Sequence, residues 1–288
     1  MNLRIRKPLG DGLTPLVDRP MEGIERIHLF TLRLGPGQAY TWEGEPGRES
    51  GLVLLQGGFD LEAGGERVEG LGPRPDVFSA PATAVYLQPG AGARITAGTE
   101  GVELAVATAP VPVGTGTGNG RTGGGVPGRT HQIVTPQDII THRGRGGPHF
   151  TRDVFDVIGS QVPAASLIVG ETFNRSGEWS SYPPHKHDRH RPPEEVKMEE
   201  VYFFRFRPRT GFALQRIYTE DRSVDEAYVV EQDDCMLLPK GYHPVAAAPG
   251  YVAYYLWVLA GEGRELRPYD DPTHAWVGRA GAPRDLHE

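Results

Sequence analysis

Two histidines separated by one residue mark the segment with the clearest potential for chemistry. The stretch WSSYPPHKHDRH, residues 179–190, contains His185, His187 and His190. Successive side chains of a β-strand point to opposite faces, so a strand here would place His185 and His187 together and Lys186 on the other side. Two imidazoles on one face supply part of a transition-metal site. The same pair is also compatible with two hydrogen-bonded core histidines.

Further ligands for a metal would have to come from neighbouring strands. Glu200 opens the apolar segment EVYFFRF, and His243 stands in the turn PKGYHP. With His185 and His187 they form a His₃Glu set, which predicts one divalent metal ion per chain. Zinc, manganese, iron, cobalt and nickel all accept such ligands. His190 lies in a charged loop, where we expect it to face solvent or another subunit, and Lys186 is expected at the solvent or at an interface.

Many short apolar runs must position these residues. The 288 residues include 39 glycines and 26 prolines, which favour a turn-rich chain. Runs with strand character recur about every 8 to 12 positions, among them ERIHLFTLRL, SGLVLLQGGFDLEA, AASLIVGETF and YVAYYLWVLA. No long amphipathic helical pattern interrupts them. The sequence therefore predicts an all-β protein.

The two halves of the chain follow the same order of segments. In each half a strand pair is followed by a polar stretch, a strand that ends in proline and glycine, and a closing strand. The first half has AYTWEGE and QPGAGA where the second has YPPHKHD and PKGYHP, so only the second keeps the histidines. Any two β-rich segments can also be aligned by chance. We predict a barrel over residues 1–110, a Gly/Thr-rich linker over 111–130 and a metal-binding barrel over 131–288.

Charge and cysteine content exclude several functions. The net charge of −7 argues against nucleic acid as a partner. The chain has no run of about 18 apolar residues and no signal-peptide pattern, so we expect a cytoplasmic protein without membrane contact. Cys235 is the single cysteine, which precludes an internal disulfide, and its apolar flanks suit a buried side chain.

Longer strings in the second half carry a family resemblance. The HxH pair, the later glutamate and the histidine turn are similar to cupin metal motifs, and VGETFNRSGEWSSYPPHKHD and GYHPVAAAPGYVAYYLWVLAG resemble the 5-deoxy-glucuronate isomerases of bacterial inositol catabolism. The resemblance spans most of the chain. It implies a bicupin whose first barrel is degenerate, and an aldose-ketose isomerase that converts 5-deoxy-D-glucuronate to 5-dehydro-2-deoxy-D-gluconate. The related 5-keto-4-deoxyuronate ketol-isomerases of pectin breakdown are the second candidate.

The glutamate departs from the general cupin pattern, in which it follows the HxH pair more closely. Four glutamates compete for the role: Glu194, Glu195, Glu199 and Glu200. Glu200 precedes VYFF, as the ligand does in the related isomerases. Its register also places it on the face of Tyr202 and Phe204, whereas Glu199 faces the other way. We therefore choose Glu200.

The implied reaction needs a metal that polarises the substrate carbonyl and either a general base or a direct hydride shift. The sequence identifies no catalytic base. Candidate substrate contacts are Tyr182, Gln215, Tyr218, Tyr255, Trp257 and, for the carboxylate of the small sugar acid, Arg152. A cupin dioxygenase and a non-catalytic sugar-binding cupin are the alternatives from other classes, and a homo-oligomer is compatible with the sequence.

Overall fold

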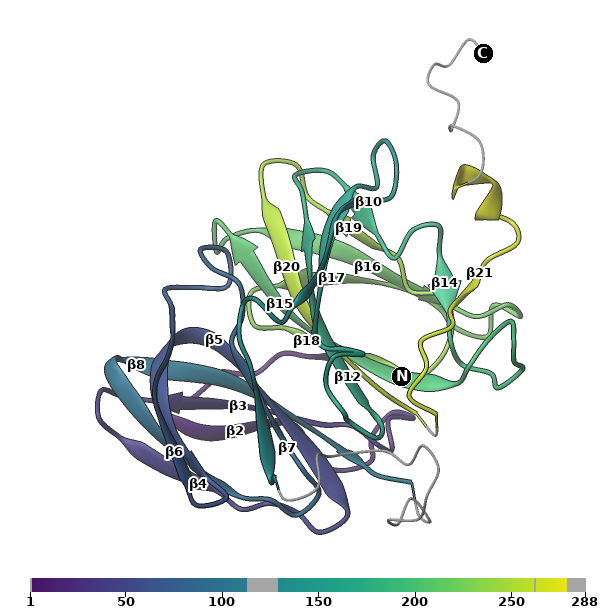
Figure 1. Cartoon of the computed structure of the whole chain (residues 1–288). Coiled ribbons are helices and arrows are strands. Elements are labelled where there is room, and N and C mark those ends of the chain that lie inside the picture. Colours follow the sequence, from purple (N-terminus) through teal and green to yellow (C-terminus); the bar gives the residue numbers. More distant parts are fainter. Residues whose placement is uncertain (1, 113–128, 262, 279–288) are drawn as a thin grey trace.

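The glycine- and proline-punctuated apolar runs fold into β-strands. The computed structural model describes residues 2–112, 129–261 and 263–278, and the one helical element among them is the short 3₁₀ helix η1, Ala275–Gly278. Figure 1 shows the strands gathered into two adjoining lobes. The predicted linker falls largely on residues 113–128, which lie outside the described residues. No helix of the described residues has the length and apolar character needed to cross a membrane.

An eight-stranded sheet forms the N-terminal barrel. Its strands are β2 (Gly12–Val17), β3 (His28–Leu34), β4 (Ala39–Trp42), β5 (Arg48–Ala63), β6 (Glu66–Arg74), β7 (Ala84–Leu87), β8 (Ala93–Pro110) and β9 (His131–Val134). The strand order is β2-β3-β8-β5-β7-β9, with β4 paired to β8 and β6 paired to β5. Leu32, Trp42, Leu52 and Phe59 belong to the apolar cluster that fills this barrel.

Two main sheets and one short pair build the C-terminal barrel. The seven-stranded sheet has the order β1 (Arg4–Ile5), β18 (Cys235–Leu238), β15 (Met198–Arg207), β20 (Val252–Gly261), β12 (Leu167–Asn174), β11 (Arg152–Ile158) and β10 (Ile140–Arg145). The four-stranded sheet has the order β13 (Trp179–Ser180), β19 (Val245–Ala247), β16 (Phe212–Tyr218) and β17 (Asp225–Glu231). The short pair is β14 (His185–Lys186) with β21 (Tyr269–Asp270).

Each barrel receives a strand from beyond its predicted boundary. In β1, Arg4 pairs with Met236 of the C-terminal sheet, and in β9, Val134 pairs with Ala84 of the N-terminal sheet. The predicted divisions at residues 110 and 131 therefore do not coincide with the strand pairing. The structure differs from the prediction because β1 contains two residues and β9 four, too few to show a pattern of their own.

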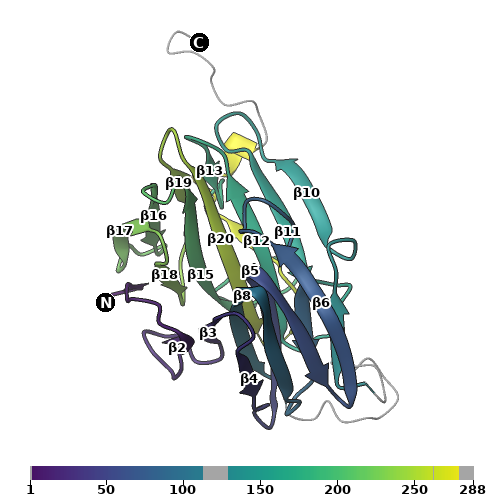
Figure 2. The ribbon, with the colours of Figure 1, turned by 90° about the vertical axis from the view of Figure 1, so that its left-hand side faces the viewer.

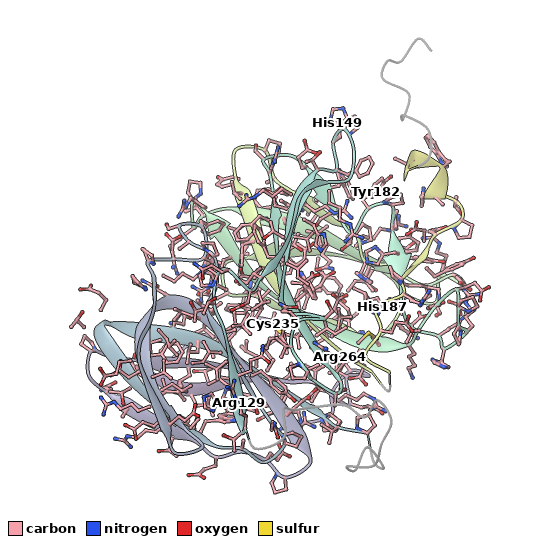
Figure 3. All side chains as sticks on the ribbon, in the orientation of Figure 1. Arg129, His149, Tyr182, His187, Cys235 and Arg264 are labelled. Atoms are coloured by element: carbon pink, nitrogen blue, oxygen red, sulfur yellow. The ribbon has the colours of Figure 1, made fainter. Side chains whose placement is uncertain are left out.

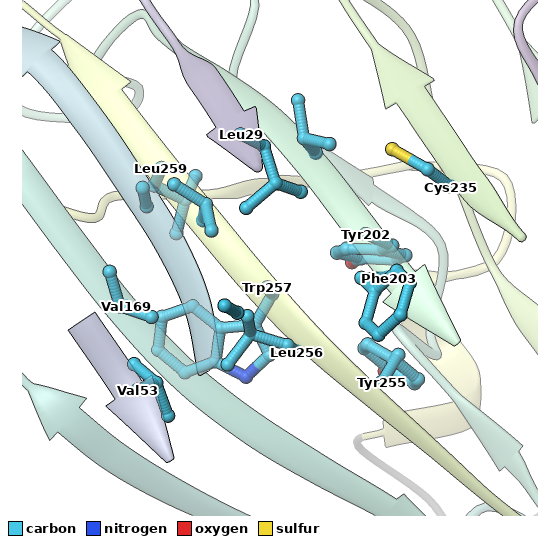
Figure 4. Close-up of a cluster of buried hydrophobic side chains, with 14 of the residues drawn as sticks. Leu29, Val53, Val169, Tyr202, Phe203, Cys235, Tyr255, Leu256, Trp257 and Leu259 are labelled. Atoms are coloured by element: carbon cyan, nitrogen blue, oxygen red, sulfur yellow. The ribbon is translucent and has the colours of Figure 1, made fainter. Parts of the chain in front are cut away.

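The two barrels share one apolar interface. Leu29 and Val53 of the first barrel belong to the same buried cluster as Val169 and Leu256 of the second (Figure 4). Gly51 lies at a close approach of the two barrels, because a Cβ there would stand 2.5 Å from Cδ1 of Ile158. Figure 2 shows β5 and β8 beside β12 and β20, which is the arrangement that this contact requires. Cys235 also belongs to this cluster and is fully buried, as predicted.

Buried carboxylates also join the barrels, among them Glu171, Glu49 and Glu199. Glu171 of β12 accepts two hydrogen bonds from Arg74 of β6, at 2.7 and 2.9 Å, and both side chains are 1% exposed. Glu49 of β5 accepts hydrogen bonds from the backbone N–H groups at residues 165–167. Glu199 of β15 accepts from the N–H groups of residues 25 and 26. Because each buried charge is hydrogen-bonded across the interface, separating the barrels would leave it unpaired.

Candidate metal centre and substrate cavity

Three buried side chains converge inside the C-terminal barrel. His187 directly follows β14, Glu200 lies in β15 and His243 lies between β18 and β19. Oε2 of Glu200 stands 3.0 Å from Nε2 of His187 and 3.2 Å from Nε2 of His243. Among the described residues, this is the group of three or more potential metal ligands whose ligand atoms all lie within 4.8 Å of one another. Figure 3 places His187 in the lobe of the C-terminal barrel.

Backbone carbonyls orient both imidazoles. Nδ1 of His187 donates to the carbonyl of Met198 at 2.8 Å, and Nδ1 of His243 donates to that of Gly241 at 2.9 Å. A carbonyl oxygen only accepts, so each Nδ1 carries a proton and each ring turns its Nε2 toward Glu200. Nε2 of His243 is buried without a hydrogen-bond partner. Two Nε2 atoms and a carboxylate oxygen converge in this way around a shared proton or a cation, and with both Nε2 atoms deprotonated this donor set fits a divalent metal ion.

The surrounding charges favour an ionised Glu200. Burial opposes ionisation, but the neighbouring His187 and His243 outweigh it and lower the pKa of Glu200 to about 2. Burial would lower the pKa of His187, whereas the hydrogen bond with Glu200 raises it. For His185, burial and then the neighbouring His243 and His187 lower the pKa well below its usual value. A neutral His185 therefore adds a further lone-pair donor beside the carboxylate.

His185 lies beside the compact group and not within it. Its ring centroid is 4.9 Å from that of His243 and 6.4 Å from that of His187. It sits on β14, whose partner strand β21 places Asp270 opposite it. The structure thus brings all four predicted ligands to one place, with three of them in direct mutual contact.

A cavity of about 470 Å³ is lined by three of these ligands, His185, His187 and Glu200. Four of the predicted substrate contacts line it: Arg152, Tyr182, Tyr255 and Trp257. Gln215 and Tyr218 do not line it. Gln215 is fully buried and donates to the carbonyl of His243 at 3.3 Å, while the Tyr218 hydroxyl donates to Asp271 at 2.7 Å. Both side chains support the site from outside, because β16 contributes them to the other sheet.

Arg152 is a partly buried cation at the cavity wall. Within the described residues no carboxylate lies within ion-pair distance of its guanidinium, which donates to three backbone carbonyls at 3.3 to 3.4 Å. Burial lowers its pKa, and the charges of Tyr255 and Asp270 offset only part of that effect. An anionic ligand would supply the missing partner.

Two further cavity residues, Ser181 and Tyr202, are not among the predicted substrate contacts. Oγ of Ser181 lies 3.2 Å from the hydroxyl of Tyr202, and both residues are buried and line the cavity. Ser181 has a φ of 50°, a left-handed conformation that non-glycine residues adopt mainly where their surroundings enforce it. The double serine before YPPHKH was the available signal, although its sequence does not reveal the backbone conformation.

The expected exposure of Lys186 is wrong. Its side chain is 1% exposed, and Nζ lies 2.6 Å from Asp188 and 2.9 Å from Glu195. Strand alternation does turn Lys186 away from the cavity, whose lining does not include it. The loop that contains Asp188 and Glu195 covers this outer face, together with the ring of Tyr269 at 5.8 Å. Tertiary cover, which alternation does not predict, explains the burial.

Comparison with known proteins gives the family context. The model of the KduI/IolB family matches residues 9–277. A 5-deoxy-glucuronate isomerase of Geobacillus kaustophilus is 42% identical over 271 residues, 94% of this chain and 92% of that protein. The 5-deoxy-glucuronate isomerase of Bacillus subtilis strain 168 is 36% identical over 96% of this chain and 99% of its own length.

Solved structures agree with the two-barrel architecture. An IolB-like protein from Salmonella typhimurium has a TM-score of 0.86 and 34% identity, with 96% of this chain and 99% of that chain covered. The oxalate decarboxylase of Lactobacillus farciminis has a TM-score of 0.66 at 13% identity over 97% of this chain and 91% of its own, a likeness of fold alone. The all-β bicupin fold predicted from the sequence is confirmed.

Proposed function

The chain belongs to the KduI/IolB family, and we propose that it is an aldose-ketose isomerase that converts 5-deoxy-D-glucuronate to 5-dehydro-2-deoxy-D-gluconate. One observation carries the proposal beyond the family relationship. A single cavity combines an inward-facing imidazole and carboxylate group with Arg152, a partly buried cation that has no carboxylate within ion-pair distance among the described residues. A sugar acid offers a carbonyl with neighbouring hydroxyls at one end and a carboxylate at the other, which matches both features.

We assign His185, His187, Glu200 and His243 as the ligands of one divalent metal ion. When bound, the ion would polarise the substrate carbonyl as a Lewis acid and stabilise the negative charge that develops on its oxygen. The chain's own residues position the substrate. Arg152 binds the carboxylate through paired N–H groups.

The aromatic side chains of the cavity complete the binding site. Tyr255 and Trp257 project from β20 into the cavity, and Tyr182 covers it from the loop before β14. Their rings exclude water from the reacting carbons. The hydroxyl of Tyr202, hydrogen-bonded to Ser181, lies at the wall, where it is available to a substrate oxygen.

Proton NMR of the metal-loaded protein with 5-deoxy-D-glucuronate tests the proposal. We expect the hemiacetal signal of the substrate to disappear and signals of a 2-ketose to replace it. In D₂O, deuterium on the former aldehyde carbon, which is C6 of the product, would indicate proton transfer, whereas retention of hydrogen there would indicate a hydride shift. Two results would contradict the proposal. In one, the metal-loaded protein leaves this substrate unchanged but isomerises 5-keto-4-deoxyuronate. In the other, it consumes oxygen when substrate is added.

Replacement of Arg152 by Leu should weaken substrate recognition. Loss of a charge-assisted hydrogen-bonded pair costs about 2 to 3 kcal/mol, so kcat/KM should fall about 30- to 150-fold. Arg152→Lys should recover part of the lost kcat/KM, because Lys keeps the charge but not the paired donors. Arg175→Leu, which removes an exposed arginine of the same barrel, is the control. Equal kcat/KM values for the Arg152→Leu and Arg175→Leu variants would refute this role.

A further inference from the structure

A compact ion cluster lies behind the predicted metal ligands. Nζ of Lys186 contacts Asp188 at 2.6 Å, Glu195 at 2.9 and 3.1 Å, and Glu220 at 3.7 Å. Lys186 and Glu195 are almost completely buried. None of these four residues lines the substrate cavity. Burial of such charges is costly unless their geometry is well satisfied, so the cluster requires an explanation outside substrate binding.

The cluster connects the two segments that carry the histidines. One oxygen of Asp188 accepts from Lys186, and the other accepts from the N–H of Gly241 at 2.7 Å. The carbonyl of the same Gly241 accepts from Nδ1 of His243 at 2.9 Å. A continuous chain of hydrogen bonds therefore runs from Lys186, which lies between His185 and His187, to His243.

Both segments are also fixed from their other sides. Glu195 accepts from the backbone N–H groups of Asp188 and Arg189 at 2.8 and 3.0 Å, which holds the backbone directly after His187. Gly241 has a φ of 87°, and a Cβ at this position would stand 2.6 Å from the carbonyl oxygen of Tyr218. The turn before His243 is thus confined between Asp188 and Tyr218.

We infer that Lys186, Asp188 and Glu195 are positioning residues that set the separation of His187 and His243 for metal binding. The inference rests on the proposed function, because the metal centre is part of that proposal. Without Asp188 the Gly241 turn loses its hydrogen bond to the HxH segment. Part of the free energy of metal binding must then fix the position of this turn. Loss of such outer partners typically weakens metal affinity about 10- to 100-fold.

Metal affinity of an Asp188→Ala variant tests this role directly. Competition between the protein and a chelator for Zn²⁺ should show a Kd about 10- to 100-fold higher than that of the wild type. At saturating Zn²⁺ most of kcat should return, because the residue does not touch substrate. Glu220→Ala is the matched control: it also removes a carboxylate near Lys186, but one that is not hydrogen-bonded to Gly241, and its Kd should stay within about twofold of wild type.

Further variants separate positioning from folding. Asp188→Asn keeps an acceptor for the Gly241 N–H and should recover part of the affinity. Lys186→Met alone would leave buried carboxylates unpaired. The second test is therefore the double variant K186M/E195Q, which also removes the charge of Glu195. It should bind Zn²⁺ about tenfold more weakly than wild type. Wild-type affinity in both Asp188→Ala and the double variant would overturn the inference while leaving the proposed function intact. A wild-type protein that binds no metal would overturn both.

Discussion

Glu200→Gln is expected to abolish tight metal binding and to lower kcat about 1,000-fold. The substitution removes the negative charge that both Nε2 atoms face, at 3.0 and 3.2 Å, and with it the anionic ligand of the site. Several kcal/mol of charge stabilisation depend on a bound metal, and about 4 kcal/mol corresponds to a 1,000-fold change in rate. Metal analysis of the purified variant and a progress curve by NMR measure the two effects.

Glu199→Gln is the matched control one residue away. Glu199 faces the opposite side of β15, where it accepts hydrogen bonds from the N–H groups of Glu25 and Arg26 at 2.9 and 2.8 Å. Metal content and kcat should therefore stay within about twofold of wild type, while the unfolding midpoint falls because a charged interface hydrogen bond is weakened. If Glu199→Gln lost the metal and Glu200→Gln kept it, the assigned ligand would be wrong.

Arg74→Met should produce the largest loss of stability. It leaves Glu171 buried, 1% exposed, without its bidentate partner at the interface between the barrels. Breaking a buried pair from one side costs about 3 to 5 kcal/mol. Thermal unfolding followed by circular dichroism should show a clearly lower midpoint than wild type.

The double variant R74M/E171L tests whether unpaired charge is the cause. With both charges replaced by apolar groups of similar size, much of the lost stability should return. Tyr254, which donates to Glu171 at 2.8 Å, would lose its acceptor and limit the recovery. A double variant as unstable as Arg74→Met would show that packing, and not the buried charge, dominates at this point.

Local rules predicted the parts of the site that depend on strand alternation. Because side chains of a strand alternate between two faces, the sequence predicts that Glu200 and Glu199 point in opposite directions. The structure places Glu200 beside His187 and His243. Alternation also turned Lys186 away from the cavity, but it gave no account of what covers the outer face. Burial by a loop depends on the tertiary structure, so the sequence of the strand alone does not predict it.

Long-range features escaped prediction for the same reason. Gln215 and Tyr218 were candidate substrate contacts because of their residue types, and the structure places them behind the cavity wall. The pairing of Arg4–Ile5 with β18 could not be read from two residues. The all-β class, in contrast, follows from many turn signals and apolar runs, each contributing to the same conclusion.

The pairing of β1 with β18 also constrains the order of events during synthesis. Translation releases the N-terminus first, yet Arg4 and Ile5 pair with Met236 and Cys235, near the other end of the chain. Similarly, the N-terminal sheet gains β9 only when residues 131–134 have left the ribosome. Domains generally fold in turn as they emerge. The N-terminal sheet can therefore close once residue 134 has emerged, whereas the C-terminal sheet can add β1 only after β18 has been made.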